Sequence, residues 1–168
     1  MRELKRSAIM RKELSKEAKL SIFKSVYIPV LTYGHESWIL TEKVRSRVQA
    51  AEMRFLRAVK GVSLLDRMYS TDIRESLEVE PLLLKIERSQ LRWYGHVLRM
   101  PPERPAKKFL FAKPTSTRPR GRPRTRWINQ VEAIGTSRSD FSTVSALREA
   151  AEDRDLWKAF LTDHPPRP

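Results

Sequence analysis

Prolines are concentrated in one stretch of this chain and limit what it can fold into there. Six of the eleven prolines lie within 23 residues, from Pro101 to Pro123. Proline lacks a backbone donor and its ring clashes with the preceding helical turn, which excludes such a stretch from a helix interior and from a central strand. From Arg99 to Arg126 the chain also holds ten Lys or Arg and one acid, Glu103. We therefore predict a basic, Pro-rich extended linker over residues 101–126.

Within this linker, residues 118–127 read RPRGRPRTRW and place an arginine at every second position. An extended chain points residues two apart to the same side, so the guanidinium groups line one edge. A row of cations on an extended chain suits a phosphate backbone or a narrow minor groove. The predicted contacts are Arg118, Arg120, Arg122, Arg124 and Arg126. Trp127 follows them, and either stacks on an unpaired base or anchors the next helix.

The whole chain is basic, with 34 Lys and Arg against 20 Asp and Glu and a net charge of +14 over 168 residues. An excess of this size indicates a polyanionic partner. Nucleic acid is favoured over an anionic membrane surface, because no strongly apolar amphipathic helix carries the charge. No apolar run is long enough for a membrane span, and the first residues lack the apolar core of a signal peptide. The expectation is an intracellular protein, nuclear or cytoplasmic, that is not secreted and contacts no membrane.

Upstream of the linker, apolar residues recur at helical spacing and predict a small helical bundle over residues 1–100. Capping residues set its helix ends: Ser15 and Thr41 suit N-caps, and Gly61 suits a C-terminal stop. The predicted helices run from Ser15 to about Ile28, where Pro29 interrupts, from Thr41 to Gly61, over 71–77 with Ser70 or Thr71 as cap, and from Pro81 to about Arg99.

Downstream of the linker, residues 127–168 predict a short C-terminal segment with two helices, over 127–134 and 145–161. Within the second helix, Leu147, Ala151 and Leu156 are expected to pack with Trp157 and Phe160. The fold class predicted for the whole chain is therefore mainly α.

Few residues offer catalytic chemistry. The chain has no cysteine, which excludes disulfides and thiolate metal sites. The histidines at 35, 96 and 164 lie far apart, with no partner at metal-ligand spacing. The densest acidic cluster, Glu152, Asp153 and Asp155, is explained by helix capping and helix-dipole interactions. We predict no catalytic residue, no metal site and no cofactor, and therefore no enzyme.

Residues 119–123, PRGRP, match the core of the AT-hook, which this segment resembles residue for residue. In that family the arginines beside the glycine lie in the minor groove of A·T-rich DNA. The resemblance implies that Arg120 and Arg122 enter the groove and that Gly121 lets the backbone approach its floor.

Four longer blocks occur in order along the chain: YGHESW at 33–38, RFLR at 54–57 with Gly61, LRWYGHVLRM at 91–100, and RGRP at 120–123 with Trp127. Together they resemble the region after the polymerase palm in the reverse transcriptases of LINE-type (non-LTR) retrotransposons. The likeness covers roughly residues 1–135. The pairing of LRWYGHVLRM with RGRPRTRW is its most specific part.

This resemblance implies a helical thumb followed by a basic linker, and a thumb grips the primer–template duplex. Its candidate contacts on the last predicted bundle helix are Arg92, His96 and Arg99, and the expected partners are DNA, RNA or an RNA–DNA hybrid. The palm, with its paired catalytic aspartates, is not matched, because no Asp-Asp pair occurs in the sequence. The palm of a full-length parent protein is an expected partner. Asn129 stands where the linker pattern of this family has aspartate.

Three interpretations stay open. The leading one is a non-catalytic nucleic-acid-binding fragment of a retrotransposon reverse transcriptase, which grips the backbone through Lys and Arg. The second is an accessory protein that uses the hook-like segment as a DNA anchor. The third is an inert retroelement remnant with no selected function, whose exposed apolar stripe would include Leu83, Ile86, Trp93 and Val97.

Overall fold

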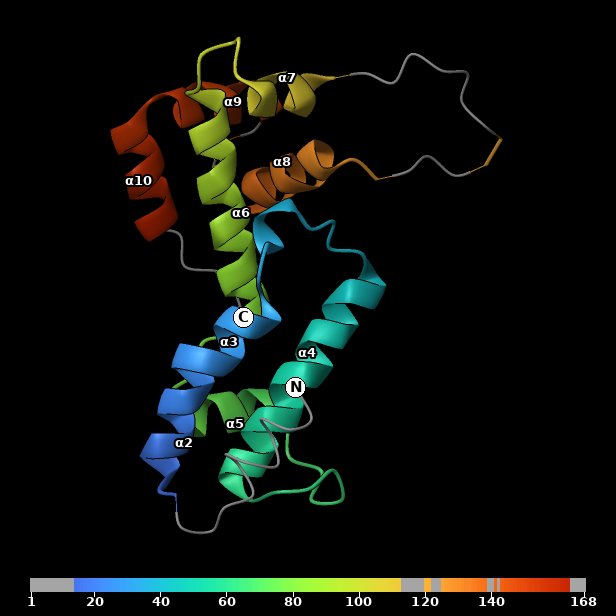
Figure 1. The fold of residues 1–168 in the computed structure, drawn as a ribbon, viewed down its shortest axis with the longest axis vertical. Coiled ribbons are helices and arrows are strands. Elements are labelled where there is room, and N and C mark those ends of the chain that lie inside the picture. Colours follow the sequence, from blue (N-terminus) through green and yellow to red (C-terminus); the bar gives the residue numbers. More distant parts are fainter. Residues whose placement is uncertain (1–13, 113–119, 122–124, 139–140, 142, 164–168) are drawn as a thin grey trace. The chain divides into compact units, whose positions relative to one another are not determined.

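The computed structural model describes residues 14–112, 120–121, 125–138, 141 and 143–163. These residues form helices and turns and no strand, which confirms the mainly α fold (Figure 1). Unit 1 comprises the described residues up to Gly34 together with Leu40–Ile86, and unit 2 comprises His35–Ile39 with the described residues from Glu87 onward. Helix α6 (Leu82–Leu98) gives its first residues to unit 1 and the rest to unit 2.

The first helical segment of unit 1 runs past the proline that we expected to end it. The hydroxyl of Ser15 caps this segment, as predicted, by accepting the Ala18 N–H at 3.2 Å. A π-helical turn precedes Pro29, and the Ile28 N–H there donates to the Phe23 carbonyl, five residues back. The wider turn accommodates the proline ring, which would clash with the carbonyl four residues back in a regular helix. The predicted end near Ile28 is therefore wrong: the elements are α2 (Lys16–Ile22), η2 (Phe23–Tyr27) and α3 (Ile28–Leu31).

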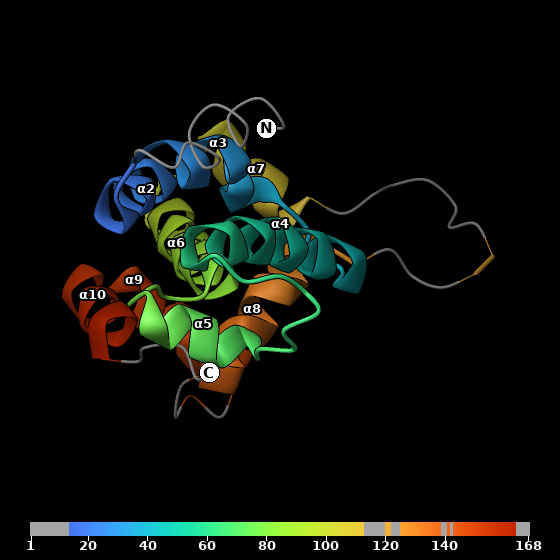
Figure 2. The same cartoon turned by 90° about the horizontal axis from the view of Figure 1, so that it is seen from below.

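Helix α4 (Glu42–Lys60) has both ends where the sequence predicts them. Thr41 Oγ1 accepts the Val44 N–H at 3.4 Å, and Gly61 ends the helix with a φ of 78°, a left-handed conformation that favours glycine. The side chains of Val48, Phe55 and Val59 are buried, together with those of Glu52, Met53 and Leu56. Through this side α4 contacts α2 and α5 (Ser70–Ser76) (Figure 2).

Three aromatic rings form the centre of unit 1. The centroid of Phe55 lies 4.9 Å from that of Phe23 and 4.5 Å from that of Tyr27. The Tyr27 hydroxyl donates to the Ala51 carbonyl at 3.0 Å, and burial raises the pKa of this phenol. These contacts join the π-helical turn to α4.

A buried carboxylate fixes the start of α6. Glu52 is 1% exposed, and it accepts from the Arg74 guanidinium at 2.8 Å and from the Leu82 N–H at 3.0 Å. The first turn of α6 therefore receives its capping acceptor from α4 rather than from an adjacent residue. Helix α5, which carries Arg74, begins after Tyr69, so the prediction of Ser70 or Thr71 as its cap is wrong by one or two positions.

The helices of unit 2 differ from the prediction in two places. A helix lies inside the segment expected to be extended, because Pro105 occupies the first helical turn, where proline is tolerated. The helix predicted over 145–161 is two helices, because Asp153 leaves the helical conformation between them. The elements are η3 (His35–Ser37), the larger part of α6, α7 (Pro105–Phe111), α8 (Trp127–Arg138), α9 (Val144–Glu152) and α10 (Arg154–Asp163).

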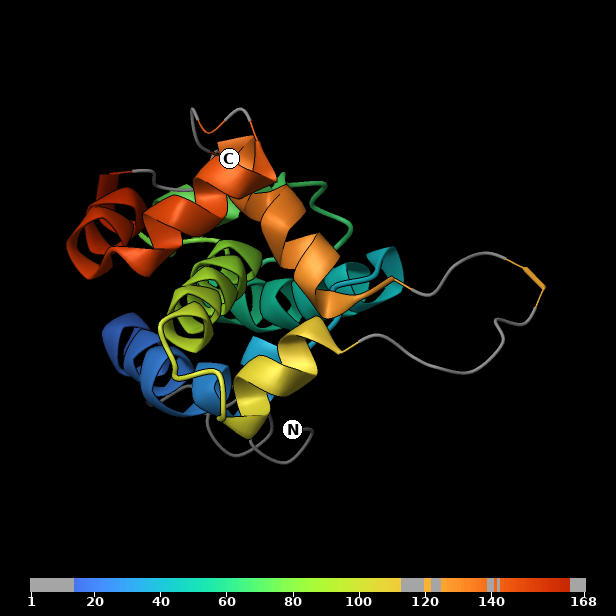
Figure 3. The ribbon, with the colours of Figure 1, turned by 90° about the horizontal axis from the view of Figure 1, so that it is seen from above.

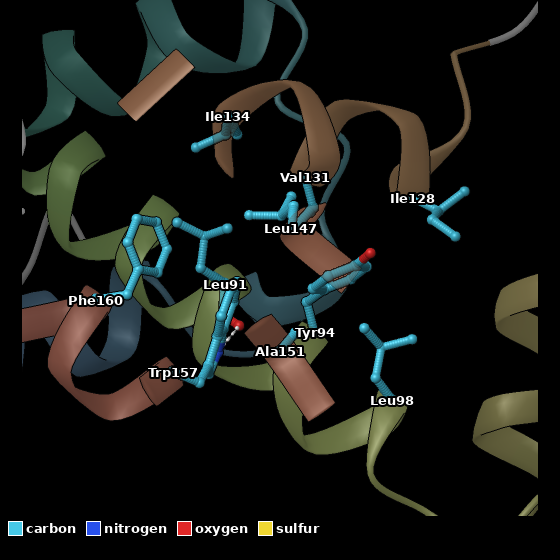
Figure 4. Packing of buried hydrophobic residues seen from close by; sticks show 10 residues of the cluster. All are labelled: Leu91, Tyr94, Leu98, Ile128, Val131, Ile134, Leu147, Ala151, Trp157 and Phe160. Carbon is cyan, nitrogen blue, oxygen red and sulfur yellow. Dashed lines mark hydrogen bonds between the residues drawn. The ribbon is translucent and has the colours of Figure 1, made fainter. Parts of the chain in front are cut away.

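The core of unit 2 gathers side chains from α6, α8, α9 and α10 (Figure 4). Helix α9 contacts both α8 and α10 (Figure 3). The predicted packing of Leu147 and Ala151 with Trp157 and Phe160 is confirmed, whereas Leu156 is 60% exposed and takes no part. The cluster contains Leu91, Tyr94, Leu98, Ile128, Val131, Ile134, Leu147, Ala151, Trp157 and Phe160.

Buried polar contacts tie these helices together. The Tyr94 hydroxyl and the Arg148 guanidinium both donate to the Glu132 carboxylate, each at 2.8 Å. Burial raises the pKa of Tyr94, and the contact with Glu132 raises it further as the second largest cause. Gln90 is fully buried, and its amide nitrogen donates to the carbonyls of His35 and Trp38. Residues 35–39 are in this way held against α6.

The stripe that an inert remnant would expose is largely covered. Ile86 is fully buried and Val97 is 2% exposed, while Leu83 is half-buried. Trp93 differs from them, because 38% of its surface is exposed.

Candidate nucleic-acid interface

The candidate contacts on α6 share one side of the helix. Arg92, His96 and Arg99 are spaced by four and three residues, which places them above one another along a helix. Arg92 and His96 are exposed, and Arg99 is half-buried. All three line one groove of about 900 Å³. The structure therefore brings together the three helical residues that the resemblance indicates.

Helix α10 supplies the other wall of this groove. Arg154 and Lys158 are four residues apart on α10, are exposed, and line the groove together with Leu161 and Thr162. Sequence reasoning missed both cations. Their spacing was visible in the sequence, but nothing local indicated that α10 packs beside α6.

Two features position α10. The Asp153 carboxylate caps its first turn by accepting the N–H groups of Asp155 and Leu156 at 2.8 and 3.0 Å. The indole of Trp157 then lies against α6, where its N–H donates to the Leu91 carbonyl at 3.1 Å (Figure 4). Gly95 makes this approach possible, because a Cβ atom there would lie within 3.0 Å of the indole ring. The glycine of the WYGH motif thus helps to form the groove.

The groove carries an excess of positive charge. Four cations line it, Arg92, Arg99, Arg154 and Lys158, against one carboxylate, that of Glu36. Arg99 is oriented by donating to the Ala151 carbonyl at 2.5 Å. The side chains of Arg92, Arg154 and Lys158 form no ion pair with any residue that the structure describes. An anion entering the groove therefore meets cations that no described carboxylate neutralises.

Trp93 lines this groove, which we call the basic groove, and it also lines a second groove. Its ring centroid lies 5.4 Å from that of His96, at an angle of 47°. The second groove, of about 330 Å³, is lined by Trp93 on one side and by α7 and the start of α8 on the other. We call it the aromatic groove; its lining comprises Ser37, Trp93, Val97, Ala106, Phe109, Leu110, Arg126, Trp127 and Ile128.

The linker residues are only partly described. Arg120 and Gly121 are exposed, and Gly121 has a φ of 123°, a backbone conformation that other residues rarely adopt. Arg126 is exposed and donates to the Ala112 carbonyl at 2.7 Å. Of the remaining predicted contacts, Arg118, Arg122 and Arg124 lie outside the described residues.

Trp127 begins α8 and packs on the core. Its indole N–H donates to the Glu36 carbonyl at 2.7 Å, and its ring centroid lies 6.4 Å from that of Tyr94. Of the two roles considered for Trp127, this placement fits an anchor for the helix that follows the linker. Part of the side chain still faces the aromatic groove.

Lys107 shows that the cations of the expected linker do not all face solvent. Its ammonium group donates to the carbonyls of Leu98 and Met100 at 2.6 and 2.9 Å. These carbonyls lie at the C-terminal end of α6, where a cation is stabilising. Lys107 therefore has a structural role, and the candidate interface rests on α6 and α10.

The described part of the chain contains no group of three or more His, Asp or Glu residues placed to hold a metal ion. Within the same ranges, no helix combines the length and the apolar character that crossing a membrane requires.

Comparison with known proteins gives a distant similarity. The chain is 27% identical over 152 residues to an uncharacterized transposon-derived protein of Caenorhabditis elegans. The match covers 87% of this chain and 54% of that protein, so the chain spans about half the length of this relative. No protein-family model and no solved structure matches the chain. The similarity supports a transposon-related origin.

Proposed function

We propose that this chain binds nucleic acid through the basic groove between α6 and α10 and supplies no catalytic group. The observation that carries the proposal is the convergence of Arg92, Arg154 and Lys158, none of them ion-paired with a described residue, on one groove. Phosphate is the partner that such cations suit, since each contact releases a condensed counterion and so favours binding. The net charge of +14 favours the same class of partner.

We further propose that the chain corresponds to the thumb and the following linker of a LINE-type reverse transcriptase. The sequence blocks that resemble this region support the assignment, and so does the similarity to a transposon-derived protein. The motif LRWYGHVLRM supplies Arg92, His96 and Arg99 of the groove, as well as Gly95, which lets α10 approach. One motif therefore supplies three of the candidate contacts and the glycine beside which α10 packs, while α10 supplies Arg154 and Lys158.

Replacing two groove cations tests the proposal. In the variant Arg92→Ala/Lys158→Ala, the slope of log K against log salt should decrease by roughly 1.4–1.8, the value for two lost phosphate contacts. Fluorescence anisotropy with labelled single-stranded DNA, duplex DNA and RNA–DNA hybrid over a salt series measures this slope.

The control removes the same charge elsewhere. Lys43 and Arg47 are exposed on α4 in unit 1, and Lys43→Ala/Arg47→Ala removes two positive charges without touching the groove. If this control changes the salt slope as much as the groove variant does, binding is a property of net charge and the proposed site is wrong.

A second candidate function rests on Gly121. Gly121 has no side chain to keep the backbone from the floor of a minor groove, its φ is positive, and Arg120 beside it is exposed. If the hook acts as a DNA anchor, Arg120→Ala/Arg122→Ala should abolish a preference for A·T-rich duplex, and a minor-groove ligand should displace the protein. Retention of binding in the presence of that ligand would leave the basic groove as the binding site.

A further inference from the structure

The basic groove and the aromatic groove share one side chain, Trp93. On one side of it lie the cations of α6 and α10. On the other side lie the exposed ring of Phe109, the half-buried ring of Trp127 and the guanidinium of Arg126. Trp93 thus lines a groove with four cations and a groove with further aromatic side chains.

Such an arrangement matches the two chemical parts of a nucleotide. Sequence-tolerant sites for single strands combine a positively charged groove that follows the backbone with aromatic side chains on which bases stack. In a duplex both faces of each internal base are already covered by neighbouring bases, so an aromatic side chain can stack only on an unpaired base. An exposed indole beside a row of cations therefore favours a single strand.

We propose that the two grooves together bind single-stranded nucleic acid, with phosphates in the basic groove and an unpaired base on Trp93 in the aromatic groove. The proposal rests on the proposed binding of nucleic acid in the basic groove. It differs from the duplex grip that the resemblance to a thumb implies, because it places a single strand in the groove and names Trp93 as the residue that selects it. At about 330 Å³, the aromatic groove is at the lower end of the volumes usual for small-ligand pockets, about 300–1,000 Å³.

Charge favours this occupant over an apolar peptide. Arg126 lines the aromatic groove, and four cations line the basic groove against one carboxylate. A peptide bound across Trp93 would have to carry several acidic groups to match these cations. A nucleotide strand provides a negative charge with every base.

The orientation of Trp93 supports its role as a platform. Its ring is in contact with the His96 imidazole on the next turn of α6, with centroids 5.4 Å apart. It is also partly buried, with 38% of its surface exposed. A ring held in this way loses less conformational freedom on binding than a fully exposed side chain would.

The test compares two oligonucleotides of equal length and charge, one of thymidines and one in which every base is replaced by an abasic tetrahydrofuran unit. Anisotropy should show the thymidine strand binding the wild-type chain roughly five- to 150-fold more tightly, the range expected for one stacked base. Trp93→Leu, which keeps an apolar side chain but removes the aromatic face, should abolish this preference. Trp93→Phe should retain part of it.

Two further measurements complete the design. Tyr69→Ala removes an exposed aromatic side chain in unit 1, and should leave the preference unchanged. Far-ultraviolet circular dichroism establishes that each variant is folded. Loss of the preference in Trp93→Leu, with helix content retained and Tyr69→Ala unaffected, supports the inference.

The remaining outcomes separate this inference from the proposed function. If both oligonucleotides bind equally tightly and with the same salt dependence, stacking on Trp93 is overturned while backbone binding stands. Tighter binding of duplex than of the thymidine strand also overturns the preference for single strands. If neither oligonucleotide nor duplex binds at moderate salt, the proposed function fails, and the inference fails with it.

Discussion

Replacing Gly95 by alanine tests how closely α6 and α10 pack. A methyl group at position 95 would lie 2.5 Å from Cδ1 and 2.9 Å from Cε2 of the Trp157 indole. Carbon atoms in van der Waals contact are about 3.5–4.0 Å apart, so the methyl group and the ring cannot both keep their positions. The indole is 2% exposed and donates to Leu91, so moving it also disturbs a buried hydrogen bond.

Two opposing effects set the size of the change. Alanine favours a helix interior over glycine by about 1 kcal/mol. Overpacking of a filled core costs about 1–3 kcal/mol, and the loss of the indole hydrogen bond costs about 1 kcal/mol more. The packing terms outweigh the gain in helix propensity. We therefore expect Gly95→Ala to lower the free energy of unfolding by about 1–3 kcal/mol.

Urea unfolding followed by tryptophan fluorescence measures this change in the right part of the chain. All four tryptophans, at positions 38, 93, 127 and 157, belong to unit 2, as does Gly95. Gly135→Ala is the matched control, because the atoms nearest to a Cβ there are the two terminal methyl carbons of Leu147, at 2.7 and 3.0 Å. The end of a flexible leucine side chain yields more easily than a rigid indole ring, so the loss in stability should be smaller than for Gly95→Ala.

Either of two results would refute this reasoning. If Gly95→Ala is as stable as the wild type or more stable, helix propensity decides and the close approach of α10 is not real. The second result concerns Trp157→Phe, whose smaller ring leaves room for a methyl group. In a double-mutant cycle the two substitutions should be coupled by about 1 kcal/mol or more, and simple additivity would contradict direct contact.

Three further predictions concern other contacts. Burial, and then the contact with Glu132, raises the pKa of Tyr94 above 10.0, so the phenol ionises in the unfolded chain before it does in the folded one. The free energy of unfolding should be unaffected by this group below about pH 10 and should fall as the pH rises further, and urea titrations should show a weaker fall for Tyr94→Phe. Glu52→Ala should lower the free energy of unfolding by about 3–5 kcal/mol, because it leaves the Arg74 cation without its buried partner. Circular dichroism at 222 nm is the readout, since unit 1 has no tryptophan. An unchanged urea midpoint would count against the role of this carboxylate. Asp153→Ala should cost about 0.5–2 kcal/mol through the lost cap of α10, whereas Asp153→Asn should retain most of the stability in the fluorescence assay.

The parts of the fold that the sequence predicts well are those set by local chemistry. Both ends of α4 follow from one hydroxyl cap at Thr41 and one glycine at Gly61, each acting within a few residues. The two prolines that misled the prediction each act in a less usual way. Pro29 is accommodated by a π-helical turn, and Pro105 lies in a first helical turn, where the donor that it lacks is not needed.

The same distinction applies to the candidate site. Arg92, His96 and Arg99 could be grouped from the sequence because helical spacing places them on one side of α6. Arg154 and Lys158 could not be added, because their approach depends on the contact of Trp157 with Gly95, 62 positions apart in the sequence. The start of α6 is a similar case, since its capping acceptor is Glu52, 30 residues earlier. Periodicity contains no information about such distant pairs.

Because the chain passes from unit 1 to unit 2 and back before residue 86, a truncated protein that ends there would contain a short segment of unit 2 without the rest of that unit. Residues 35–39 belong to unit 2, although the segments on either side of them belong to unit 1. Hydrogen bonds from Gln90 and from the indole of Trp127 hold them, and both donors come later in the sequence. A stop codon shortly after residue 86 would remove both residues and leave the carbonyls of His35, Glu36 and Trp38 without these donors. Gene copies that keep the first unit but lose the second should therefore encode a product with an unsupported loop, which cellular proteases would cut there first.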